Sequence, residues 1–170
     1  MKVLTPEECP KWLKDAGISH DPYRGVGEAS HHYMTGGLTD ARRSIAFARN
    51  LIRAVEPKGD HLLEITDWST YQEDEMAVVQ SVRASFGETR WLIKSPGHVF
   101  LSSDLDLCVG LFALTIAYGW SSFIYTSKPR LTIFNWEGDM FEFWSDEKKT
   151  IEVTKKFCRL HELPKHERDA

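Results

Sequence analysis

Cysteine is scarce in this sequence, and no two cysteines are close neighbours. The chain of 170 residues contains three, Cys9, Cys108 and Cys158, and none belongs to a CxxC pair. An odd number at wide spacing does not indicate a disulfide framework or a zinc site made of thiolates. Cys108 lies within an apolar stretch, so we expect it to be a small buried side chain in the core.

The sequence also has no long hydrophobic run and no excess of basic residues. Its longest apolar stretch, 107–120, is shorter than the roughly 20 residues that a membrane-spanning helix needs. The beginning, MKVLTPEECPKW, lacks the apolar segment of a secretory signal. The net charge is −4 and the pI is near 6.0, whereas nucleic-acid binders usually carry a basic surface. We therefore expect a cytoplasmic protein with no membrane partner and no nucleic-acid partner.

Short motifs for cofactors and for nucleophilic catalysis are missing as well. The chain has no GxGxxG or Walker-type loop, no GxSxG nucleophile elbow and no HExxH pair. His20, His31 and His32 are close in sequence, but adjacent histidines do not share one helix face as residues four apart do. We expect these histidines to lie in a solvated loop within 18–37, and we expect no cofactor.

What the sequence does contain is typical of a globular α/β domain. Apolar residues make up 42% and charged residues 27% of the chain. We predict an irregular N-terminal segment with a short helix (1–38), a single α/β domain (39–162) and a frayed tail (163–170). Apolar periodicity and capping signals predict helices near 5–17, 39–56, 70–87, 103–119 and 145–160. Short apolar or aromatic runs predict strands at 61–66, 90–94, 122–126, 131–136 and 140–144.

The order of these elements predicts the arrangement of the sheet. Strand, helix, strand, helix, strand over 61–126 is typical of crossovers between parallel strands. The last three strands are separated by KPR and EGD, which predict tight antiparallel turns. The expected fold is a mixed sheet of about five strands, with a parallel β-α-β-α-β portion followed by an antiparallel meander, and with helices packed on it.

Parallel strands would bring several polar residues to one edge of the sheet. Ligands of such sheets bind beyond the carboxyl ends of the strands, where 66–70, 94–104 and 126–130 would then meet. This acidic strand edge would carry Asp67, Trp68, Glu73, Asp74, Lys94, His98 and Asp104. Its carboxylates oppose phosphate binding and suit either a hard cation or a basic protein surface. They also suit helix capping and complementation of the helix dipoles.

His98 is the candidate for catalysis. It follows Ser95, Pro96 and Gly97, which have the form of a type II turn with glycine where a positive φ is needed. The turn explains the proline and the glycine but does not require a histidine. Titration near neutral pH would let His98 act as an acid or base, with Asp67 and Asp104 beside it as metal ligands. The alternative is a structural or surface histidine.

Two further surfaces are candidates for binding. Arg42, Arg49 and Arg53 fall on one side of the helix near 39–56, and we call them the basic ridge. Such a ridge is either a solvated face or a docking site for an acidic partner. The meander carries aromatic pairs spaced two residues apart, among them Phe134 and Trp136. Each pair is core if a helix covers it, and a binding platform if it stays open.

The stretches LLEITDWSTYQEDE and WLIKSPGHVF give the chain a resemblance to a protein family. Over 40–120 it resembles an uncharacterised family of bacterial soluble proteins. The resemblance implies a bacterial cytosolic setting and brings no catalytic residues with it.

These observations favour a non-enzymatic function. We expect a protein-binding domain, of an interaction or inhibitor-like kind, that uses the acidic strand edge or the aromatic sheet face, including Trp136, against another and possibly basic protein. One alternative is a metal-assisted hydrolase with His98, Asp67 and Asp104 in its site. Another is a structural homodimer that buries the aromatic face across a two-fold axis.

Overall fold

The computed structural model describes residues 1–18 and 31–164, and its strands form one sheet. The order is β1-β4-β3-β5-β6-β7-β2, and all neighbouring strands are antiparallel. The strands are β1 (Lys2–Leu4), β2 (His31–Gly36), β3 (Lys58–Asp67), β4 (Gly97–Phe100), β5 (Ser121–Lys128), β6 (Arg130–Trp136) and β7 (Met140–Ser145). The helices are α1 (Glu8–Asp15), α2 (Ser44–Val55), α3 (Glu73–Ser85), α4 (Leu105–Ala117) and α5 (Lys148–Leu160).

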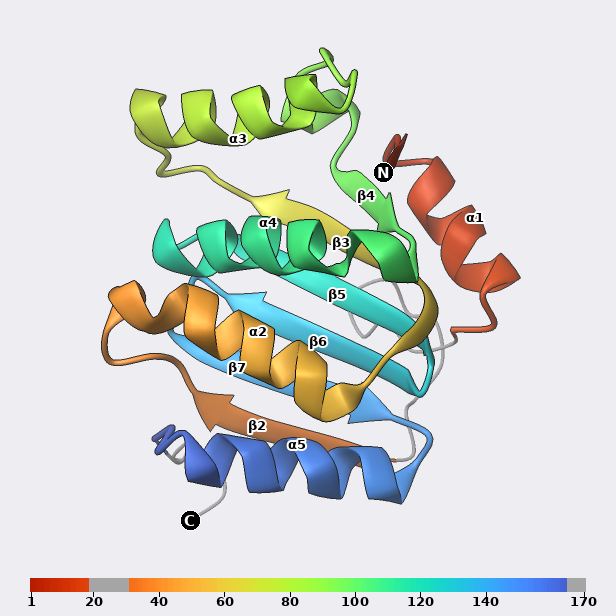
Figure 1. Ribbon diagram of the computed structural model, residues 1–170, viewed down its shortest axis with the longest axis vertical. Helices are drawn as coiled ribbons and strands as arrows, with labels where there is room; N and C mark the ends of the chain where they lie inside the picture. Colours follow the sequence, from red (N-terminus) through yellow and green to blue (C-terminus); the bar gives the residue numbers. More distant parts are fainter. Residues whose placement is uncertain (19–30, 165–170) are drawn as a thin grey trace.

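The predicted parallel portion of the sheet is wrong. β3 is antiparallel to both of its neighbours, β4 and β5. The chain returns beside β3 after α3, so this connection joins neighbouring antiparallel strands instead of crossing over the sheet. β4 and β5 do run in the same direction, but β3 lies between them and α4 spans it on one face (Figure 1).

The strand predicted at 90–94 is also misplaced. Leu92–Lys94 is a short 3-10 turn. The strand of this region is β4, which begins later in the chain, is four residues long and is buried at every residue. Gly97 is not among the glycines with a positive φ, so the predicted type II turn is not formed. His98 therefore lies within a strand and not after a turn.

Other predictions are confirmed. The antiparallel meander is formed by β5, β6 and β7, with Ile124 opposite Ile133 and Ile133 opposite Phe143. Asn135 stabilises the turn between β6 and β7. Its Oδ1 accepts from the Gly138 N–H at 3.0 Å, and its Nδ2 donates to the Trp120 carbonyl at 2.8 Å. Helices occur where the periodicity predicts them.

The two outermost strands were not predicted. β1 pairs with β4, and β2 pairs with β7 from His31 opposite Ser145 to Gly36 opposite Met140. Both lie at sheet edges and take their position from backbone hydrogen bonds to an existing strand. HHYMTG lacks a regular apolar alternation, so its pattern carries little information about a strand.

The sheet divides the core into two parts because side chains alternate between its faces. Leu63 and Ile65 of β3 join the main core beneath α2, α4 and α5, which cover one face in Figure 1. Leu62 points the other way, into a smaller cluster with Cys9 and Leu13 of α1. Among the described residues, no helix combines the length and hydrophobicity needed to span a bilayer.

We predict that the thiols resist modification in the folded protein. Cys9, Cys108 and Cys158 are all buried, and burial raises the pKa values of Cys108 and Cys158 to about 12. Thiolate is the reactive form, so it is scarce at neutral pH. Reaction with an aromatic disulfide reagent should be slow in buffer and complete within minutes in denaturant. Rapid modification of the native protein would contradict this packing.

Candidate functional site

The acidic strand edge is not assembled in the structure. His98 pairs with Leu63, four residues before Asp67, which places Asp67 about 13 Å farther along the antiparallel strand β3. Asp104 follows β4 at the opposite end, where it accepts from the amino group of Met1 at 3.2 Å. Within residues 1–18 and 31–164, no three His, Cys, Asp or Glu side chains form a set of metal ligands. The structure thus does not bring Asp67, His98 and Asp104 together.

The remaining residues of that predicted edge lie in different environments. Trp68 is partly buried and packs against the main core. Glu73 and Asp74 are exposed in the first turn of α3, and the capping box of this helix is made by Gln72 and Glu75. These carboxylates complement the helix dipole, as the alternative interpretation held. Lys94 is exposed at the end of its 3-10 turn.

His98 is fully buried and is part of a polar cluster centred on Arg83. Its Nε2 accepts a hydrogen bond from Nε of Arg83 at 3.0 Å, so the ring proton is on Nδ1. The other guanidinium nitrogens donate to Gln80, to the Arg90 carbonyl and to Ser95. Burial and the positive charge of Arg83 lower the pKa of His98 to about 3. His98 is therefore neutral near pH 7 and holds α3 to β4.

The aromatic sheet face is largely buried. Phe123 stacks on Phe134 with ring centroids 4.4 Å apart, and both are at most 6% exposed, as is Tyr125. Phe141 and Phe143 point to the opposite face and belong to the main core. Trp136 is 49% exposed at the end of β6, and the neighbouring aromatic rings of the meander do not form an open platform around it.

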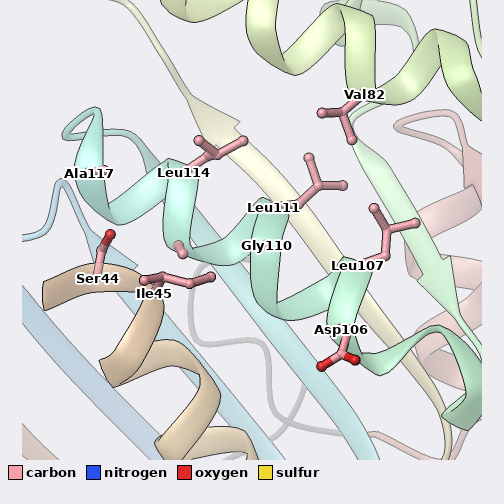
Figure 2. A pocket seen from close by; sticks show the side chains of 10 residues that line it. Ser44, Ile45, Val82, Asp106, Leu107, Gly110, Leu111, Leu114 and Ala117 are labelled. Atoms are coloured by element: carbon pink, nitrogen blue, oxygen red, sulfur yellow. The ribbon is translucent and has the colours of Figure 1, made fainter. Parts of the chain in front are cut away.

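An apolar hollow lies on the outer side of α4, between α2 and α3, and we call it the α4 groove. It has a volume of about 370 Å³, and Figure 2 shows its side chains. Its floor is the side of α4 that carries Leu107, Gly110, Leu114 and Ala117, none of which is buried. Ser44 and Ile45 of α2 lie on one side of it. Val82 of α3 lies on the other.

The groove exists because α3 stands apart from α4. Met76 and Val79 anchor α3 in the main core, with Val82 packed against it. The Arg83 cluster fixes its C-terminal half to β4 through hydrogen bonds and not through contact with α4. Val78 is one turn before Val82 on the same flank and is 42% exposed. The wall formed by α3 is therefore apolar and accessible.

Gly110 lies in the middle of α4, where packing does not require a glycine. A Cβ atom built on it would meet nothing within 4 Å, and its φ is not positive. Glycine in a helix interior costs about 0.8–1 kcal/mol relative to alanine. The residue lowers the stability of α4 and leaves the floor of the groove open.

Sequence reasoning did not identify this groove, although one signal was present. The helix at 103–119 is apolar nearly all round, which predicts burial on every side. The structure covers α4 on the sheet side and on its flanks but leaves the strip with Leu107, Gly110 and Leu114 half-buried. Because α4 is apolar on all sides but is not covered on all sides, another element can pack against its open strip.

No protein-family model, curated protein or solved structure matches this chain. The resemblance of 40–120 to a bacterial family, and the cytosolic setting it implies, therefore stay predictions. The proposed function therefore rests on the geometry of the described residues.

We predict that stability decreases as the pH falls from about 6.5 towards 3. Unfolded His98 takes up a proton in this window while folded His98, with its pKa of about 3, does not. The free energy of unfolding should change by up to about 1.4 kcal/mol per pH unit on this account. Urea titrations at about pH 4.5 and about pH 7 should show a smaller difference for His98→Gln, whose amide oxygen still accepts from Arg83. Equal pH dependence in both proteins would contradict this role.

We also predict that Gly110→Ala stabilises the protein. The change should add about 0.8 kcal/mol, or roughly 2–3 °C in the melting temperature, because the new methyl group meets no neighbour. Gly119→Ala is the matched control: Gly119 has φ +65, so alanine there should destabilise. Thermal melts of the two variants measure the difference, and a loss of stability in Gly110→Ala would mean that the site is crowded.

Proposed function

We propose that this protein is a non-enzymatic protein-binding domain whose α4 groove receives the apolar face of a helix from a partner protein. The observation that carries the proposal is the open apolar floor of α4, with Gly110 at its centre. Apolar surface left in a concave site gains free energy when a partner covers it.

The chemistry of the groove favours binding over catalysis. Its polar lining residues are Ser44 and Asp106, and they lie at opposite ends of the groove in Figure 2. General acid–base or nucleophilic catalysis needs such groups within hydrogen-bonding distance of one another or of a common reacting atom. Neither residue has a histidine or a second carboxylate beside it in the lining.

The shape of the groove favours a helix as the occupant. Leu107, Gly110, Leu114 and Ala117 follow the spacing of one helix face, so the floor is a straight strip along α4. α4 has 13 residues, about 20 Å of helix, which matches three to four turns of a partner. Packed helices lie about 8–10 Å apart, and small side chains such as those of Gly110 and Ala117 allow the closer end of this range. Helix-in-groove binding uses this kind of surface.

A second copy of the chain is the other occupant to consider, because a structural homodimer is an alternative function. Its α4 groove would then be buried across a symmetric interface. Sedimentation of the wild-type protein and of a groove variant distinguishes the two. A wild-type dimer that the groove variant dissociates would replace the partner proposal with the homodimer.

The direct test uses a designed peptide with leucines at i, i+3, i+4 and i+7, labelled for fluorescence anisotropy. We expect binding in the micromolar range to the wild-type protein and at least about tenfold weaker binding to Gly110→Trp, which fills the floor. Leu160→Trp is the matched control because Leu160 is 73% exposed at the end of α5.

A peptide of the same composition in scrambled order, without the apolar face, completes the test. It should not bind to any of the proteins. If the designed peptide fails to bind the wild-type protein, or binds Gly110→Trp equally well, the proposed function is wrong.

A further inference from the structure

We infer that the outer side of α2 and α5 binds the phosphate backbone of double-stranded nucleic acid. The basic residues of 41–55 and 148–160 form this surface, which we call the α2–α5 basic face. None of them lines the α4 groove, so this binding goes beyond the proposed function and does not depend on it.

Positive charge is concentrated on these two segments although the chain as a whole is acidic. Residues 41–55 include four arginines and no acidic residue, and residues 148–160 include four lysines, one arginine and one glutamate. Each segment therefore has a net charge of +4, within a total of −4. The acidic residues that flank them lie at or beyond the helix ends: Asp40, Glu56, Glu147 and Glu162. The total, from which we expected no nucleic-acid partner, does not show this separation of charge.

α2 and α5 lie side by side, so their charges form one surface. Both helices cover the same face of the sheet in Figure 1, and the rings of Phe47 and Phe157 have centroids 5.4 Å apart. Burial lowers the pKa of His161, and the positive charge of Arg43 lowers it further, so Arg43 lies near the C-terminal end of α5. The exposed sides of the two helices face away from the sheet, and each is about 20 Å long.

Most cations of the α2–α5 basic face have no counter-charge. Arg42 pairs with Asp40 at 3.0 Å, and Lys155 pairs with Glu152 at 3.3 Å. In the described ranges, 1–18 and 31–164, the other basic residues of this face form no ion pair. Like charges one helical turn apart occur in both helices, where they repel each other and destabilise the helix. A row of phosphates would supply the missing negative charge.

The side chains of this face suit a duplex better than a protein or a single strand. The core of a protein interface is depleted in charged residues and enriched in aromatic ones. Here the aromatic residues, Phe47 and Phe157, are buried. The large exposed apolar residues are Ile45, in the groove lining, and Leu160, at the end of α5. Single strands need exposed aromatic rings for base stacking, whereas duplex phosphates need only arginine, lysine and polar side chains.

The test measures the fluorescence anisotropy of a labelled DNA duplex of about 20 base pairs as the full chain is added. At about 50 mM salt we expect a dissociation constant of about 10 μM, independent of base sequence. The logarithm of the affinity should fall with the logarithm of the salt concentration at a slope of about −4, as expected for four or five phosphate contacts. An RNA duplex, which has the same phosphate chemistry, should bind with similar affinity.

Charge reversal locates the binding surface. Arg49→Glu/Lys156→Glu should weaken duplex binding at least about tenfold and make the salt slope shallower. Lys11→Glu/Lys14→Glu on α1 is the matched control, because it makes the same change in net charge on the opposite side of the sheet. The control should stay within about twofold of the wild-type affinity at about 150 mM salt. The neutral variant Arg49→Gln/Lys156→Gln should give an intermediate loss, which keeps the test valid if charge reversal disturbs the fold.

The outcomes also separate this face from the α4 groove. Failure of the wild-type protein to bind duplexes, tighter binding of a single strand, or equal losses in the two charge-reversal variants would overturn the inference. Polyglutamate that binds more tightly than the duplex would assign the face to an acidic protein instead. The leucine peptide that tests the groove should bind Arg49→Glu/Lys156→Glu as it binds the wild-type protein, so each proposal can fail without the other.

Discussion

The buried guanidinium of Arg83 is the interaction on which the arrangement of α3 depends. It donates to the His98 ring, to Gln80, to Ser95 and to the carbonyl of Arg90, so that a charged group with 0% exposure has acceptors around it. Removing one partner from a buried charged group is costly, and these hydrogen bonds therefore restrict where α3 can lie. Because they attach the helix to β4, α3 does not close onto α4, and the α4 groove stays open.

The directions of the strands show which parts of the fold could be predicted from the sequence and which could not. Local periodicity located the helices and the β5–β7 meander, because those signals depend on neighbours within a few residues. Whether β4 runs with or against β3 depends on how the intervening chain folds, and α3 is compatible with both. The apolar residues of 90–94 added to the error: Trp91 and Ile93 are 66% and 65% exposed, whereas Gly97 and His98 form the buried strand.

The candidate site was predictable only in its parts. The apolar character of α4 follows from the spacing of residues in one helix and is present in the structure, whereas the basic ridge is not part of the groove lining. The groove depends on the distance between α3 and α4, which is set by a side chain that reaches a different element. His98 shows the same limit: its pKa is decided by burial and by Arg83, fifteen residues earlier, and not by its neighbours in sequence.

The energetics of α4 connect the fold to the proposed binding. Gly110 lowers the stability of α4, since a methyl group there would fit without contact and raise helix propensity. Likewise, Ile45 is 44% exposed, and Leu114 packs against the main core but stays half-buried in the free protein. A partner helix that lies against the groove would account for both features. Its close approach to Gly110 would let Leu107, Leu114 and Ile45 contact the apolar face of the partner. The partner helix proposed above would account for an open groove that the stability of the free chain does not require.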